Sequence, residues 1–156
     1  MEELWEYRQK MTDRFEAVVD DLEQAVENIP PQEYFSPLEP GGWNLHQVLV
    51  HLRDAEAHAF LPRIELILSQ DHPYLENFDD EAWMAAHYDP AEPVKAVLDE
   101  YRRLRRRELK LLRLMPARSW SRAGLHPVQR VRSLQWWVEY SLSHAEEHLR
   151  QIRREG

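Results

Sequence analysis

The sequence predicts an all-α protein built as a four-helix bundle. Three observations lead to this prediction. Apolar residues repeat every three or four positions along four long segments, no segment alternates as a convincing strand would, and 156 residues is the size of one domain. Four amphipathic helices in a chain of this length bury their apolar faces most simply against one another. We therefore expect residues 1–156 to form a single helical bundle domain.

The first helix is expected from about Glu2 to Asn28, with its apolar residues spaced by three and four. Pro30 and Pro31 end it, because proline lacks the amide donor and clashes with the preceding turn. The long connection that follows means that the topology need not be simple up-down-up-down.

The second helix begins after Asn44, a good N-cap that forms a variant of the capping box with Gln47. Its apolar pattern runs to Leu68. Pro62 lies inside this pattern and removes the hydrogen bond to the carbonyl of His58, so we expect a kink there and not an end.

A short extra helix is expected at Asp80–Ala86, between the second and third long helices. The third long helix is predicted to start with Asp89 as its cap and Pro90 at its first position, where proline is well tolerated. Its apolar stripe continues to Met115.

Residues 116–132 show no strong pattern and are expected to form a loop. The fourth long helix is predicted from near Ser133 to about Arg154. One face of it carries Trp137 and Ser141, followed by His144 and His148, and should point into the bundle.

The composition excludes several classes of protein. The chain has no cysteine, so disulfides and thiolate chemistry are excluded. It has 28 acidic and 20 basic residues and a net charge of −8, which disfavours nucleic-acid binding. No apolar stretch approaches the roughly 20 residues of a membrane span. The N-terminus is unlike a signal peptide, so we expect a cytoplasmic protein.

A band of arginines follows the third long helix. Its simplest interpretation is a solvated face paired with acidic neighbours, and the alternative is a binding surface for an anionic ligand. The members of the band are Arg102, Arg103, Arg105, Arg106, Arg107, Arg113, Arg118 and Arg122.

Three histidines are the candidate metal ligands. His144 and His148 are four residues apart, which places both imidazoles on one helical face, and His51 lies on the inward face of the second helix. Such a set would leave a coordination position open, as in catalytic zinc sites. The competing interpretation is chance, because the chain has eight histidines. His58 shares the face of His51 and is either an outer partner or a rival ligand.

Two further residues have the spacing of outer partners. Asp54 is three residues after His51, and Gln151 is three residues after His148. Either could accept the second ring N–H of a ligating histidine, which fixes the tautomer of the ring. The alternative for both is an ordinary surface polar residue.

Two segments carry a resemblance to a known family. Trp43–Asp54, with its leading tryptophan and His-Leu-Arg-Asp end, and His144–Ile152, with its His-x-x-x-His-x-x-Gln-Ile pattern, resemble the DinB-like (YfiT-like) superfamily of bacterial four-helix-bundle metalloproteins. The resemblance implies that His51, His144 and His148 bind one divalent metal ion, usually zinc or nickel, and that the protein forms a homodimer. It implies no single reaction, because relatives include thiol-dependent S-transferases and isomerases.

Two functional hypotheses follow. In the first, the chain is a metal-dependent S-transferase or hydrolase that activates a low-molecular-weight thiol or a water for attack on a small substrate. In the second, it is a non-catalytic metal-binding or ligand-binding module. The mark of that module would be a protein group, such as His58 or His87, that closes the fourth coordination position.

Overall fold

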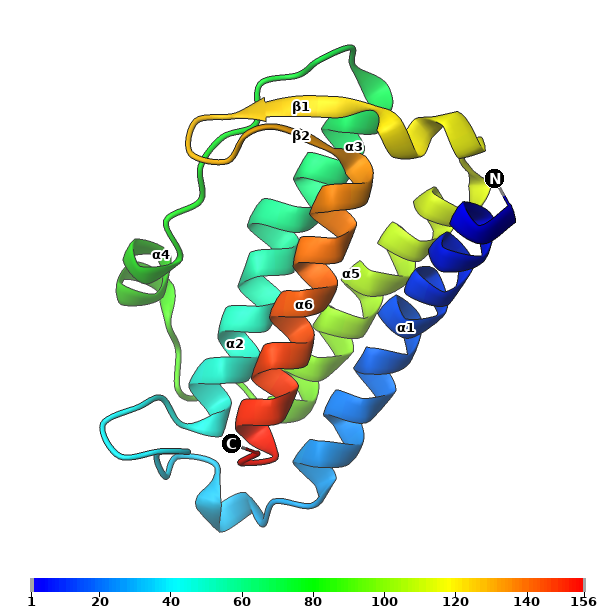
Figure 1. The fold of residues 1–156 in the computed structure, drawn as a ribbon. Coiled ribbons are helices and arrows are strands. Elements are labelled where there is room, and N and C mark those ends of the chain that lie inside the picture. Colours follow the sequence, from blue (N-terminus) through cyan, green and yellow to red (C-terminus); the bar gives the residue numbers. More distant parts are fainter. Residues whose placement is uncertain (1, 156) are drawn as a thin grey trace.

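The computed structural model describes residues 2–155 and confirms the four-helix bundle (Figure 1). Four long helical segments run side by side, a short helix stands apart from them, and a two-stranded hairpin crosses one end. The elements are α1 (Glu2–Glu27), α2 (Leu45–Ala55), α3 (Leu61–Ser69), α4 (Asp80–His87), α5 (Val94–Leu114), β1 (Ala123–His126), β2 (Arg130–Ser133) and α6 (Leu134–Ile152).

The topology is not simple up-down-up-down. The α2–α3 segment and α5 run in the same direction, because the connection carrying α4 returns along the side of the bundle before α5 begins (Figure 1). α1 and the α2–α3 segment each pack against both α5 and α6. α2 and α6 are therefore antiparallel neighbours, although they lie far apart in the sequence.

The second long helix starts and continues as predicted. The Asn44 side chain accepts a hydrogen bond from the backbone of Gln47, and the Gln47 side chain accepts one from the backbone of Asn44. A π-helical turn at Glu56–Phe60 joins α2 to α3, and the helix passes through Pro62 without ending. The irregularity caused by the missing proline donor thus lies in the turn before Pro62, where the amide of Leu61 donates to the carbonyl of Glu56.

The predicted start of the third long helix was wrong. α5 begins at Val94, and Asp89 instead accepts a hydrogen bond from the backbone of Ala91 in a separate turn. The reason is Pro93, which restricts the residue before it to extended conformations and so interrupts any helix started at Pro90.

The prediction of a structureless loop at 116–132 was also wrong. A 3-10 turn at Ala117–Ser121 leads into an antiparallel hairpin, in which Ala123 pairs with Ser133 and His126 with Arg130. Strands of four residues, one of them mostly exposed, give too short a pattern for sequence periodicity to detect.

The hairpin is attached to the connection before α4. The amide of Leu75 donates to the carbonyl of Leu125, and the amide of Leu125 donates to the carbonyl of Pro73. Leu75 itself is fully buried. These bonds hold the hairpin across the end of the bundle.

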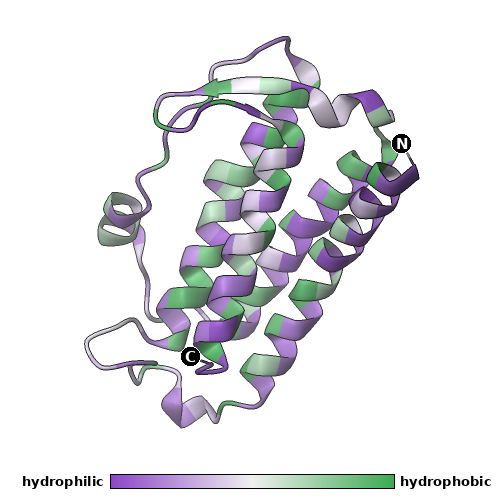
Figure 2. Cartoon of the chain, in the orientation of Figure 1, coloured by the Kyte–Doolittle hydropathy of each residue, from purple (hydrophilic) through white to green (hydrophobic). Residues whose placement is uncertain are grey.

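The core has two apolar clusters along the bundle. One surrounds Leu22 and Leu45, and the other surrounds Phe15 and Trp137. Figure 2 shows hydrophobic and hydrophilic residues alternating around the long helices, as expected of amphipathic segments. Among the described residues, no helix is long and apolar enough to cross a membrane.

A buried ion pair crosses the core. Arg105, fully buried, donates to the carboxylate of Glu56 at 3.0 Å and to the hydroxyl of Ser141 at 3.1 Å. The hydroxyl of Ser141 in turn donates to Glu56 at 2.8 Å. The expectation of a solvated face was therefore wrong for Arg105, although Arg102 pairs with exposed acidic neighbours as predicted.

Candidate metal centre

Three histidine rings meet between α2 and α6. Nitrogen atoms of His51, His144 and His148 all lie within 4.8 Å of one another, close enough for one ion to contact all three. The Nε2 atoms of His51 and His144 are 2.9 Å apart, and the three ring centroids are separated by 4.7–5.1 Å. The structure thus brings together the three residues that the sequence singled out.

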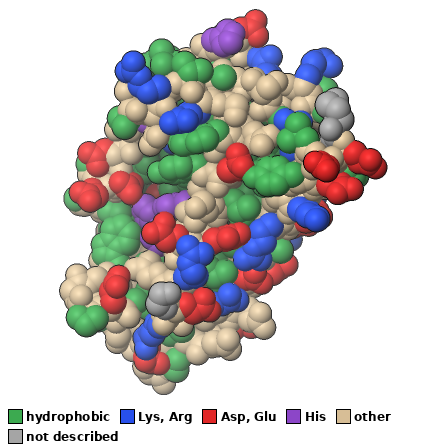
Figure 3. Space-filling view, in the orientation of Figure 1, with side chains coloured by type: hydrophobic (Ala, Val, Ile, Leu, Met, Phe, Trp, Pro, Cys, Tyr) green, Lys and Arg blue, Asp and Glu red, His purple; other side chains and the backbone are tan. Residues whose placement is uncertain are grey.

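The helix packing explains this convergence. His144 and His148 are one turn apart on α6, and His51 faces them from α2. His51 is buried, with 5% of its surface exposed, whereas His144 and His148 are partly exposed. Figure 3 shows histidine side chains at the surface on this face, with acidic side chains beside them.

Two acceptors orient the rings from outside. Oε1 of Gln151 lies 2.8 Å from Nδ1 of His148, as its spacing suggested. Asp80, at the start of α4, places a carboxylate oxygen 3.4 Å from Nδ1 of His51, an ion-pair distance without a completed hydrogen bond. Acceptors beside Nδ1 favour the tautomer with the proton there, which leaves the Nε2 lone pairs of both rings free.

The other two candidates for outer partners of the ligand histidines, Asp54 and His58, contact other groups instead. The carboxylate of Asp54 accepts from Nε of Arg53 at 2.8 Å, in a cluster that also includes Glu92, so it does not contact His51. The expectation that Asp54 orients His51 was therefore wrong, because the carboxylate of Asp54 pairs with the guanidinium of Arg53 instead.

His58 turns toward α4. Its ring lies 4.0 Å from that of Trp83 and 5.6 Å from that of Phe78, measured between centroids. His87 stacks on the same tryptophan at 3.9 Å. Within residues 2–155, neither histidine belongs to the group that could hold an ion.

The buried rings are neutral at physiological pH. Burial, helped by the nearby His148, lowers the pKa of His51 to about 4, while Asp80 opposes the shift. Burial also lowers the pKa of His144 to about 3, with His148, His51 and Arg105 acting in the same direction. Neutral imidazole is the form that binds a metal, so these rings are ready as ligands without first losing a proton.

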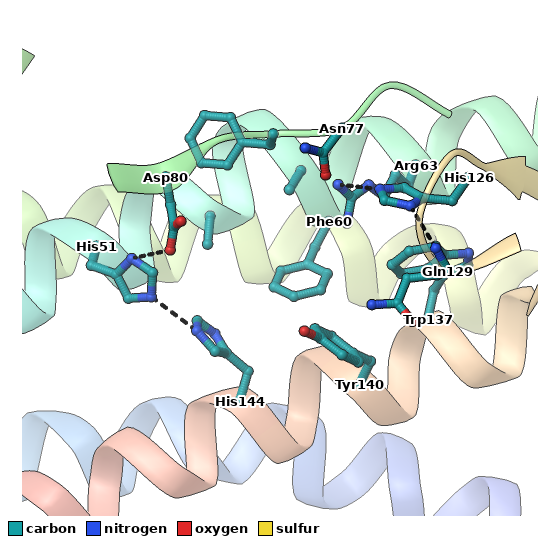
Figure 4. A pocket seen from close by; sticks show the side chains of 13 residues that line it. His51, Phe60, Arg63, Asn77, Asp80, His126, Gln129, Trp137, Tyr140 and His144 are labelled. Atoms are coloured by element: carbon teal, nitrogen blue, oxygen red, sulfur yellow. Dashed lines mark hydrogen bonds and ion pairs between the residues drawn. The ribbon is translucent and has the colours of Figure 1, made fainter. Parts of the chain in front are cut away.

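A cavity of about 170 Å³ opens beside the triad (Figure 4). His51 and His144 line one end of it, and Arg63 and His126 line the other, with Phe60 and Tyr140 between them (Figure 4). None of the band arginines, for which anion binding was the alternative interpretation, lines this cavity.

Sequence reasoning missed several residues of this cavity. Asp80 gave no signal, because it follows a long connection whose path only the tertiary structure sets. His126 was one of the chain's eight histidines and had no distinguishing motif, and the hairpin that carries it was not expected. Trp137 was placed on the correct face of α6, but with no role beyond packing.

Comparison with known proteins identifies the family. The sequence profile of the DinB superfamily matches residues 14–152. YfiT of Bacillus subtilis (strain 168), whose name proposes a metal-dependent hydrolase, is 28% identical over 122 residues, which are 78% of this chain and 68% of that protein. A Bacillus pumilus (strain SAFR-032) relative whose name proposes the same activity is 28% identical over 151 residues, 92% of this chain and 85% of its own length.

Solved structures agree with this assignment. The structure of Bacillus subtilis YfiT, described as a four-helix bundle of unusual topology, has a TM-score of 0.88 at 25% identity and covers 96% of this chain and 86% of that one. A second four-helix-bundle protein has a TM-score of 0.63 at 18% identity, over 94% of this chain and 98% of its own, which shows the fold alone. The matched profile and the shared fold together establish that this chain belongs to the DinB superfamily.

Proposed function

We propose that this chain is a metal-dependent enzyme, with one divalent cation held by His51, His144 and His148. The observation that carries the proposal is the convergence of three ring nitrogens within 4.8 Å at the end of a cavity. The chemistry of the donor set fits: imidazole nitrogens suit zinc and nickel, and three protein ligands leave a position for a water or a substrate.

We propose hydrolysis of a small substrate as the reaction, because the relatives' names propose metal-dependent hydrolysis. When bound, a divalent cation lowers the pKa of a water or of a thiol toward neutrality and polarises a carbonyl or phosphoryl oxygen. Transfer to a low-molecular-weight thiol would use the same site, so a thiol cosubstrate is the second reaction to test.

The chain's own residues have supporting roles in this proposal. Asp80 and Gln151 hold protons on the outer nitrogens of His51 and His148, so that both rings present lone pairs inward. Phe60 and Tyr140 line the cavity beside His144 and limit the water around a bound substrate. The low pKa values of His51 and His144 keep both rings neutral, with one N–H each, throughout the neutral range.

The non-catalytic alternative has less support. It called for a protein group that closes the fourth position, and the two candidates named for this, His58 and His87, instead pack against Trp83. The homodimer and the cytoplasmic location stay predictions, which sedimentation and cell fractionation would measure.

Metal analysis of the purified protein tests the site. We expect about one zinc or nickel ion per chain in the wild type and less than about a tenth of that in His144→Ala. His58→Ala, a matched loss of an imidazole outside the triad, should keep its metal. Equal metal content in all three proteins would contradict the proposed ligands.

Assays of the metal-loaded protein then test the activity. Hydrolysis of activated esters, amides and phosphoesters, and thiol transfer to small electrophiles, should be measured with and without chelator. Turnover that chelator abolishes and the ion restores supports an enzyme. A fully loaded protein without turnover on the whole panel would favour the binding module.

A further inference from the structure

Arg63 is a buried arginine without an acidic partner. It lies on α3 with 8% of its surface exposed, and no carboxylate among residues 2–155 forms an ion pair with it. Its Nε has no hydrogen-bond partner, and its Nη2 lies 3.4 Å from the carbonyl of Glu76. Burial of an unpaired charge is costly, and Arg105, the fully buried arginine of the core, is paired with Glu56.

The neighbour of Arg63 on the hairpin is a second donor. Nδ1 of His126 accepts hydrogen bonds from the backbone amides of Val128 at 3.1 Å and Gln129 at 3.0 Å. That nitrogen therefore carries no proton, and the proton of the neutral ring is on Nε2. Burial and the charge of Arg63 lower the pKa of His126, which keeps the ring neutral.

The contact between these two residues consequently lacks an acceptor. Nη2 of Arg63 lies 3.4 Å from Nε2 of His126, and both atoms carry hydrogen (Figure 4). Trp137 adds a third donor: its ring lies 4.6 Å from the Arg63 guanidinium carbon, its surface is 1% exposed, and its Nε1 has no partner. All three side chains line the cavity that His51 and His144 line at the other end.

We infer that the Arg63, His126 and Trp137 donors bind the anionic group of a small substrate, a carboxylate or phosphoryl oxyanion, whose reacting part extends toward the histidine triad. The claim that the anion belongs to a substrate rests on the proposed function. The existence of an anion-binding site does not. An oxyanion supplies acceptor lone pairs for Nε of Arg63, Nε2 of His126 and Nε1 of Trp137, and guanidinium binds such groups through two parallel hydrogen bonds.

An anion bound in the cavity would also explain why the charge of Arg63 has no acidic partner. The cavity has the histidine triad at one end and a guanidinium at the other, so an anion can compensate the charge of Arg63 without occupying the proposed metal position. Asn77 and Gln129 also line the cavity at the end where Arg63 lies, and their amides add further polar groups there (Figure 4).

Binding of probe anions to the metal-free protein tests this inference separately from the metal site. The probes are propionate and methylphosphonate, with neutral propionamide as the control, and the readout is proton–nitrogen NMR of the Trp137 indole and of the Val128 and Gln129 amides. We expect at least one anion to shift these signals saturably, with a dissociation constant of about 1–10 mM. The anion that binds more tightly identifies the chemical class, and propionamide should cause no shift.

Variants of Arg63 complete the test. Arg63→Met should weaken anion binding at least about tenfold, and Arg63→Lys, which keeps the charge but loses the paired donors, should weaken it several-fold. Arg107→Met, which removes an exposed arginine paired with Glu65, should bind like wild type. If the Met variant does not fold, the Lys variant and the propionamide control still decide.

Three results would overturn the inference. These are no shift with either anion at about 100 mM, equal shifts with propionamide, or unchanged affinity in the folded Arg63 variants. If the protein binds anions but no metal, the proposed function fails and the anion site remains.

Discussion

The carboxylate of Asp80 lies 3.4 Å from Nδ1 of His51, so α4 reaches across to the triad formed by α2 and α6. Without this acceptor, the orientation and the tautomer of the His51 ring should be less well fixed. We expect Asp80→Asn to weaken zinc or nickel affinity by about tenfold or more, the usual cost of losing an outer partner. Competition with a chromogenic chelator measures it.

Asp54→Asn is the matched control for that change. It removes the same charge three residues from His51, but its carboxylate binds Arg53 and not the triad. Its metal affinity should stay within about twofold of wild type. A larger loss in Asp54→Asn than in Asp80→Asn would reverse the assignment of the outer partner.

Replacement by glutamine should destabilise the protein much more at Glu56 than at Glu108. Glu56 accepts a hydrogen bond from Arg105, whereas buried Glu108 accepts none, and its Oε2 lies 3.8 Å from Nε of Arg105. Burial, together with the adjacent Glu56, raises the pKa of Glu108 well above its usual value, although Arg105 opposes the shift, and this favours the neutral acid form of Glu108. Glu56→Gln breaks a buried ion pair and should cost about 3–5 kcal/mol.

Glu108→Gln replaces a neutral acid by a neutral amide of the same shape. Its free energy of unfolding should change by less than about 1 kcal/mol. Urea unfolding followed by circular dichroism compares the two variants. Equal losses, or a larger loss in Glu108→Gln, would contradict this assignment of the proton.

The metal-free protein should lose stability as the pH falls. His51 and His144 have folded pKa values of about 4 and about 3, below the ordinary histidine value of about 6.5. Both rings are neutral in both states above about pH 6.5, so the stability is full there. Below it the unfolded chain binds protons that the folded chain excludes, and the free energy of unfolding decreases.

Between about pH 7 and about pH 5 this loss should be about 2 kcal/mol for each of the two histidines. Urea unfolding of the chelator-treated protein at several pH values measures it. His144→Asn removes one titrating ring, so its stability should depend less steeply on pH. An identical slope in that variant would exclude His144 as a source.

Gly124 lets the hairpin sit close to the connection before α4. A Cβ at this position would lie 2.9 Å from Cδ1 and 3.0 Å from Cγ of buried Leu75, and 3.2 Å from the carbonyl oxygen of Pro73. We expect Gly124→Ala to cost about 1–3 kcal/mol by overpacking. It should also weaken anion binding, because the hairpin carries His126.

Val131→Ala is the comparison for that change, since Val131 is on β2 with 64% of its surface exposed. Thermal unfolding should show little effect for Val131→Ala and a lower midpoint for Gly124→Ala. Equal midpoints would mean that Leu75 moves aside at no cost.

Local signals were sufficient for most of the helices and for placing His144 and His148 on one helical face. The capping box at Asn44 and the spacing of His144 and His148 act within one or two turns, so the sequence alone predicts them. The prediction for the start of α5 was wrong because Pro93 interrupts any helix that begins at Pro90. Asp80 and His126 were beyond reach, because long-range packing of α4 and of a short hairpin decides where they lie.

The ring pair 51 and 144 is separated by 93 residues in sequence, and two of the three proposed ligands belong to α6, the last helix of the described chain. During synthesis, a chain that ends before α6 holds at most one of these ligands. Ion capture would therefore follow the docking of α6 against α2, and a bound ion would report that these two distant segments have come together.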